Sequence, residues 1–124
     1  MLQATHTNAA PAAIGPYSQA VSMGDLIFTS GQIPLDPATM EIVGDEIVAQ
    51  AQQVMKNLGA ILEASGTSFD KVIKTTCFLA DMADFAAFNE VYAKYFVSKP
   101  ARSCVAVKTL PKNVLCEVEV IACK

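Results

Sequence analysis

Tryptophan is absent from this chain of 124 residues, histidine occurs once, and charged residues make up only 17% of the sequence. Nine basic and twelve acidic residues give a net charge of −3, so there is no basic excess to displace counterions from a nucleic acid. The chain also has no apolar run near the ~18 residues that a membrane-spanning helix needs and no signal-peptide pattern at its start. These absences argue against nucleic-acid and membrane partners and predict a cytoplasmic protein.

Groups for metal or thiol chemistry are equally few. The four cysteines show no CxxC spacing, and the only histidine, His6, lies in a polar stretch near the start. A metal site or a Cys–His catalytic pair therefore has few side chains to draw on. We interpret Cys77, Cys116 and Cys123 as small apolar core residues, and we expect a solvated His6 and no metal site.

Apolar residues, by contrast, make up 52% of the chain, and the mean hydropathy is +0.36. Residues 1–124 suffice for a single domain with its own core and are too few for two. This apolar content exceeds what one small core can bury. The excess apolar surface is expected to be buried between subunits, which predicts a homo-oligomer. A monomer with an apolar surface is the alternative.

The periodicity of apolar residues predicts an α+β protein. The expected elements are, in chain order, strands at 19–22 and 26–30, a helix at 47–62, a strand at 71–80, a helix between Asp81 or Asp84 and Pro100, and strands at 103–109 and 114–123. The first two strands are predicted to form a hairpin. They follow a loop rich in alanine and proline, and the first of them is expected at a sheet edge. This order places both helices on one face of a sheet.

The two helices carry different patterns. In the first, Gly44–Asp45 is expected to cap the start and Ser65–Gly66 to end the last turn. Its polar side is predicted to be solvated and carries Gln50, Gln52, Gln53, Lys56, Asn57 and Glu63. The second helix has an apolar stripe of Phe85, Phe88, Val91, Tyr92, Tyr95 and Phe96. We interpret this stripe as core rather than as a base-stacking surface, because positive charge is missing.

Arg102 is the charged residue that is hardest to place at the surface. It lies at the start of a strand among small and apolar neighbours, where burial of a guanidinium is costly unless an anion pairs with it. A planar guanidinium binds a carboxylate through two parallel hydrogen bonds. Arg102 is therefore a candidate anion-binding residue, and strand alternation puts Cys104 on the same face.

The last strand has one apolar face and one mixed face. The apolar face holds Val114, Cys116, Val118, Val120 and Ala122, and the mixed face holds Leu115, Glu117, Glu119, Ile121 and Cys123. The mixed face fits contact with another subunit or a solvated edge strand with an Arg–Glu pair. If the last two strands pair antiparallel, Cys104 and Glu117 share a face only when paired residue numbers sum to an odd value. Otherwise Glu117 has to reach the site by another route, such as across a subunit boundary.

Several ordered motifs resemble the RidA (YjgF) family, the reactive intermediate deaminases. They are residues 12–20 (AAIGPYSQA), 29–34 (TSGQIP), 74–76 (KTT), 84–85 with Asn89, 100–105 (PARSCV), 110–111 (LP) and Glu117. The resemblance implies a chorismate-mutase-like fold in which a six-stranded mixed sheet carries two helices on one face. It also implies a homotrimer whose sheets form a central barrel, with ligand clefts between subunits. The segment 97–99 is shorter than in many members of that family.

The resemblance implies an activity as well. Deaminating members of the family hydrolyse enamine and imine acids, such as 2-aminoacrylate, to 2-oxo acids and ammonia without a metal or organic cofactor. The chain is accordingly expected to be a 2-iminobutanoate/2-iminopropanoate deaminase, a hydrolase acting on C–N bonds. In the matching positions, Arg102 would clasp the substrate carboxylate and Glu117 would position water. The substrate site would be lined by Tyr17, Ser30, Gly31, Asn89 and Cys104.

Other functions stay open at this stage. A non-catalytic regulatory protein could use Arg102 to bind a small carboxylate, and only turnover would distinguish it from the deaminase. Relatives have also been described as ribonucleases, translation inhibitors or chaperone-like proteins. The acidic charge and the lack of an evident catalytic histidine argue against action on RNA.

Overall fold

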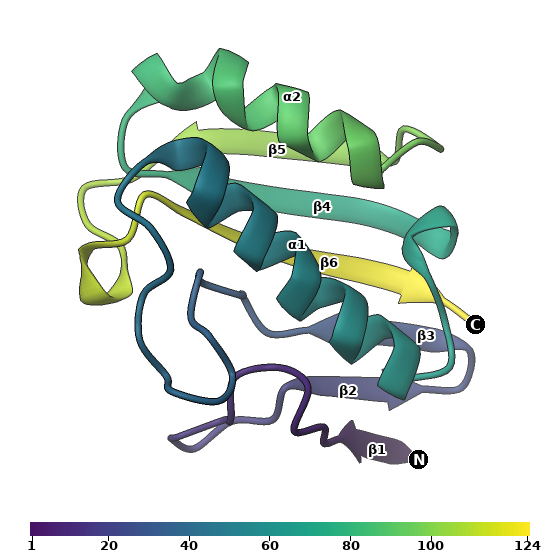
Figure 1. Ribbon diagram of the computed structural model, residues 1–124. Coiled ribbons are helices and arrows are strands. Elements are labelled where there is room, and N and C mark those ends of the chain that lie inside the picture. Colours follow the sequence, from purple (N-terminus) through teal and green to yellow (C-terminus); the bar gives the residue numbers. More distant parts are fainter.

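The computed structural model describes all 124 residues. The chain forms a six-stranded sheet with two helices on one face (Figure 1). The elements are β1 (Leu2–Thr5), β2 (Ala20–Met23), β3 (Leu26–Thr29), α1 (Ile47–Ala64), β4 (Val72–Leu79), α2 (Phe85–Tyr95), β5 (Ala101–Ala106) and β6 (Cys116–Cys123). The strand order is β1-β2-β3-β6-β4-β5, and only β4 and β5 run parallel. This architecture confirms the expected mixed sheet. Neither α-helix combines the length and apolar character that crossing a bilayer requires.

The hairpin of β2 and β3 is confirmed, with Gly24 in the left-handed region at its turn. The expectation that β2 is an edge strand is wrong, because β1 pairs with it antiparallel and forms the edge itself. Most side chains of β1 are exposed. Since β1 is held by backbone pairing and buries little, its sequence carries no alternating apolar pattern.

The ends of α1 differ in how well they were predicted. Its N-cap is Glu46, whose carboxylate accepts the backbone N–H groups of Val48 and Ala49, and not Gly44–Asp45 as expected. The end is as expected: Ser65 is the C-cap, and Gly66 follows in the left-handed conformation that terminates many helices.

Two polar residues of α1 are buried, although a solvated face was expected. Asn57 is 0% exposed and donates from Nδ2 to the carbonyls of Ile33 (3.1 Å) and Leu35 (3.0 Å). Gln50 accepts the backbone N–H of Leu115 through Oε1 at 2.8 Å. These bonds fix the loop after β3 and the chain just before β6 against the helix, and both segments flank candidate site residues.

The last two strands are not partners of each other, so the pairing considered from the sequence is wrong. β4 lies between them, and Phe78 pairs with Val105 of β5 on one side and with Glu117 of β6 on the other. Because directly paired residues share a face, Glu117 points to the face opposite that of Arg102 and Cys104. The local sequence could not reveal this arrangement, which depends on β4, where Phe78 precedes its partner Glu117 by 39 residues.

The sheet has a helix face, covered by α1 and α2, and an open face. The core lies on the helix face and includes Cys77, Cys116 and the expected apolar side of β6. Cys123 was expected in the core but is half-buried on the open face. Besides Glu117 and Glu119, the open face presents exposed apolar side chains, among them Met23, Leu26, Phe28 and Val105.

Candidate functional site

Arg102 is held on the helix face by side chains of α2. It lies at the start of β5, is half-buried, and donates from Nη1 to Oδ1 of Asn89 at 2.7 Å. Its guanidinium carbon is 4.7 Å from the ring centroid of Tyr92 and 5.5 Å from that of Phe85. Both distances allow cation–π attraction. Phe85, Asn89 and Tyr92 follow at i, i+4 and i+7, so one face of α2 presents all three to the guanidinium.

The charge of Arg102 has no anionic partner within the subunit. A guanidinium has five N–H donors, and the bond to Asn89 is the only hydrogen bond of this side chain. The titratable groups that Arg102 influences are the Tyr92 phenol and two thiols: burial raises the pKa of Cys77 to about 12 and also raises the pKa values of Cys104 and Tyr92. Both thiols are neutral at pH 7, so the remaining donors face a site without a counter-charge.

A groove of about 470 Å³ opens beside this guanidinium. Its polar groups come from Asn89, Lys99 and Arg102, and its apolar wall from α2 and the chain that follows it. Lys99 adopts the left-handed conformation and donates its N–H to the carbonyl of Phe96 at 3.1 Å. The short 97–99 segment thus forms a tight turn that places a second cation at the groove.

Glu117 lies on the open face against Gly31. A Cβ at position 31 would be 2.0 Å from Oε2 of Glu117, so only glycine leaves room for this carboxylate. Gln32 and Val118 exchange backbone hydrogen bonds of 2.8 and 3.1 Å, which anchors the loop to β6 at this point. Burial, and to a smaller extent the charge of Glu119, raises the pKa of the half-buried Glu117 carboxyl.

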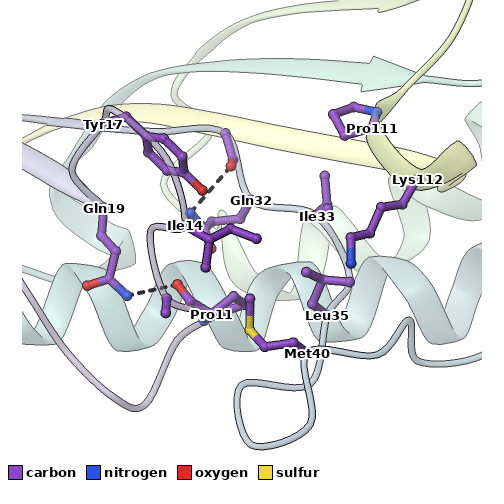
Figure 2. A pocket seen from close by; sticks show the side chains of 12 residues that line it. Pro11, Ile14, Tyr17, Gln19, Gln32, Ile33, Leu35, Met40, Pro111 and Lys112 are labelled. Carbon is purple, nitrogen blue, oxygen red and sulfur yellow. Dashed lines mark hydrogen bonds between the residues drawn. The ribbon is translucent and has the colours of Figure 1, made fainter.

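Gly31 also lines a cavity of about 180 Å³, which is shown in Figure 2. The cavity is enclosed by the loop 11–19, the loop 31–40, Pro111 and Lys112. The Lys112 side chain extends into it toward Ile33 and Leu35 (Figure 2). Tyr17 contributes its ring from an exposed position. Ser30 is not among the lining residues, and its hydroxyl donates to the carbonyl of Ser18 at 2.6 Å.

The predicted site residues therefore form two groups within one subunit. Arg102, Asn89 and Cys104 gather on the helix face at the β5 edge; Glu117, Gly31, Ser30 and Tyr17 belong to the neighbourhood of β6 and the β3 end. Arg102 and Glu117 are separated by two strand spacings and three residue steps, roughly 14 Å between Cα atoms. They also point to opposite faces, so a single subunit does not bring them together.

Apart from Asn89 and Cys104, sequence reasoning did not identify the groups that surround Arg102. Phe85 and Tyr92 were assigned only to the core, and Thr75 was given no role. Tyr92 is 8% exposed and does pack in the core, while its ring also faces the guanidinium. The available signal was the spacing of Phe85, Asn89 and Tyr92, which puts the two aromatic rings on the helix face that carries the candidate Asn89.

Known proteins resemble this chain in sequence and in structure over nearly its whole length. The sequence model of the family described as Endoribonuclease L-PSP matches residues 7–124. A RutC family protein of Pyrococcus horikoshii is 55% identical over 125 residues, which cover 100% of this chain and 99% of that protein. YyfA of Yersinia pestis, described as a member of the Rid protein family, has a TM-score of 0.97 at 44% identity, covering 100% of both chains. Escherichia coli TdcF, solved with bound serine, has a TM-score of 0.93 at 45% identity, covering 98% of both chains.

Proposed function

Because this chain belongs to the Endoribonuclease L-PSP family, which includes the RutC and RidA proteins, we propose that it is a deaminase of imine and enamine acids. Its substrates are 2-iminobutanoate and 2-iminopropanoate, with enamine tautomers such as 2-aminoacrylate, and its products are 2-oxo acids and ammonium. The observation that carries the proposal is Arg102, a half-buried guanidinium with one hydrogen bond, to Asn89, and no carboxylate partner.

Arg102 binds the substrate carboxylate through two parallel N–H donors. The bond from Nη1 to Asn89 Oδ1 and the rings of Phe85 and Tyr92 leave the other donors available, and a planar guanidinium matches the geometry of a carboxylate. The serine bound in TdcF supports this assignment, because serine carries a carboxylate next to a nitrogen-bearing carbon, as the imine acids do.

Glu117 handles the protons of the hydrolysis. It accepts a proton from water as the water oxygen bonds to C2 of the iminium and the C=N π pair moves to nitrogen. It then returns this proton to the amine of the tetrahedral intermediate. As the C–N bond breaks and ammonia leaves, the hydroxyl proton passes to the Glu117 carboxylate and from there to the ammonia, so the products are a 2-oxo acid and ammonium. A carboxyl with a raised pKa suits both steps, since efficient general acid–base groups have a pKa near the working pH.

The proposal includes a homotrimer with a site between subunits. Arg102 and Glu117 point to opposite faces of one sheet, so a substrate that meets both needs groups from two copies. The exposed apolar side chains of the open face support burial against further copies of this chain. In this assembly the open faces form the central barrel, and the Arg102 group of one subunit meets the Glu117 group of another. The assembly is tested by multi-angle light scattering, for which we expect three times the 13.2 kDa of one chain.

Hydrolysis of an imine fits the available side chains better than cleavage of RNA does. The chain carries a net charge of −3 and one histidine, and that histidine, His6, is exposed beyond the end of β1. An imine is already activated toward water, so holding the carboxylate, placing a water and moving protons suffices. Arg102 and Glu117 supply these three roles.

The experiment is a coupled assay in which a serine or threonine dehydratase generates the enamine and 2-oxo acid formation is followed. The wild-type protein should accelerate it, while Arg102→Ala and Arg102→Lys should not, because an ammonium cannot form the two parallel bonds. Lys94→Ala is the matched control, since Lys94 is an exposed cation on α2 outside the groove. No acceleration by a folded wild-type trimer would contradict the proposal and favour a ligand-binding regulator.

A further inference from the structure

Two buried hydroxyl groups meet directly beneath Arg102. Thr75 is the register partner of Arg102 on β4 and is 0% exposed. Its Oγ1 shares a hydrogen bond of 2.8 Å with the phenol oxygen of Tyr92 on α2. The same Tyr92 ring lies under the guanidinium at 4.7 Å. A strand residue, a helix residue and the candidate anion-binding residue thus form one connected group.

Packing alone does not require this pair of hydroxyls. The other helix-facing residues of β4, Val72, Cys77 and Leu79, are buried apolar groups. Valine and phenylalanine would fill nearly the same volume as Thr75 and Tyr92 without polar atoms to desolvate. Replacement of both partners of a buried hydrogen bond by apolar groups of the same shape can be nearly neutral for stability. The hydroxyl pair therefore calls for a role other than filling the core.

We infer that the hydrogen bond between Thr75 and Tyr92 positions Arg102, so that both are positioning residues for the carboxylate site. The bond ties the outer end of the Tyr92 ring to β4, which fixes the ring beneath the guanidinium. Asn89, one turn earlier on α2, holds Nη1. The guanidinium then meets a carboxylate with its orientation already set, which lowers the ordering cost of binding. This inference rests on the role of Arg102 in the proposed function.

The test uses Thr75→Val and Tyr92→Phe, which remove one hydroxyl each and keep the side-chain shape. Arg102 binds the substrate carboxylate equally well in the ground state and in the transition state. Weaker binding by Arg102 therefore raises KM and leaves kcat within about two-fold. The expected rise in KM is about 3- to 10-fold, which corresponds to the net contribution of one hydrogen bond. The double variant should be no worse than either single variant, because both break the same bond. Thr75→Ser keeps the hydroxyl and should restore the wild-type KM.

Tyr95→Phe is the matched control. Tyr95 is a half-buried tyrosine of the same helix, packs against Phe69 with ring centroids 5.4 Å apart, and its hydroxyl makes no hydrogen bond within the subunit. Its KM should equal that of the wild type. Thermal unfolding and light scattering of every variant show whether the fold and assembly are kept. An unchanged KM in folded Thr75→Val and Tyr92→Phe overturns the inference, and so does a fall in kcat at constant KM.

Calorimetric titration with 2-oxobutanoate separates this inference from the proposed function, because binding requires Arg102 but no turnover. If the wild type binds 2-oxobutanoate without hydrolysing imines, and Tyr92→Phe binds it about 3- to 10-fold more weakly, the positioning role stands and the deaminase proposal fails. If Arg102→Ala binds it as tightly as the wild type, the positioning role fails. No binding by the wild type overturns the positioning role, while the deaminase proposal is decided by the turnover assay.

Discussion

The contact between Gly31 and Glu117 allows a test of the carboxylate by a substitution at another residue. In Gly31→Ala, the added Cβ would lie 2.0 Å from Oε2 and 2.8 Å from Cδ of Glu117, whereas ordinary contacts begin at 3.4 Å. Gly31 does not adopt the left-handed conformation, so alanine brings no backbone strain. The Glu117 side chain therefore has to move, and its oxygen has to retreat by about 1.4 Å.

The size of this displacement sets the expected effect on catalysis. A misplacement of about 1 Å can cost roughly 100-fold in rate, and general acid–base help contributes about 10²–10⁴-fold in all. We expect kcat/KM of Gly31→Ala to fall about 100-fold in the coupled dehydratase assay. The unfolding free energy should change by less than about 1.5 kcal/mol, because the group that yields is the far end of a flexible side chain.

A double variant shows whether the effect passes through Glu117. Gly31→Ala combined with Glu117→Ala should be no less active than Glu117→Ala alone, since the displaced carboxylate is then absent. If Gly31→Ala keeps most of its activity, the placement of Glu117 does not matter for the reaction. If it lowers activity by the same factor with and without Glu117, the cavity beside Gly31 and not the carboxylate is responsible.

Two further predictions concern pH and the buried amide of α1. Burial raises the pKa of Glu117, so the contribution of this group to stability is fully present below its unfolded pKa of about 4.3 and is lost as pH rises through the higher folded pKa. Glu117→Gln should therefore raise Tm at pH 7, with a difference from wild type that vanishes near pH 4; an equal gain at both pH values would contradict the argument. Asn57→Ala leaves the carbonyls of Ile33 and Leu35 without their donor and should lower the unfolding free energy by about 2–3 kcal/mol in urea titrations at fixed protein concentration. Gln52→Ala, an exposed change on the same helix, should have little effect, and a similar loss in both variants would refute the role of Asn57.

Local sequence patterns were sufficient to predict the helices and strands that bury one regular apolar face. The apolar spacing between Ile47 and Leu62 predicted α1, and the turn around Gly24 predicted the hairpin of β2 and β3. The polar residues of α1 were misinterpreted because periodicity treats every amide as solvated. Gln50 and Asn57 are buried because backbone groups from distant segments meet them, and no spacing within the helix contains that information.

In the candidate site, too, local sequence patterns predicted some features and missed those that depend on distant segments. The alternation of β5 correctly placed Arg102 and Cys104 on one face, and the mixed face of β6 was correctly separated from its core face. Local patterns could not predict how β5 and β6 lie relative to each other, because β4 lies between them in the sheet. The aromatic neighbours of Arg102 were missed for a related reason: Tyr92 both packs in the core and faces the guanidinium, and a pattern of apolar residues indicates only the packing.

The position of β6 in the sheet bears on how the chain acquires its structure during synthesis. β6 is the last strand in chain order, yet it lies between β3 and β4 (Figure 1). Until it is made, β1–β3 and β4–β5 are two separate ribbons, each with an unpaired edge where β6 belongs, and such edges invite association with other chains. The sheet can therefore close only after β6 has been synthesised, and this strand is the one that carries Glu117.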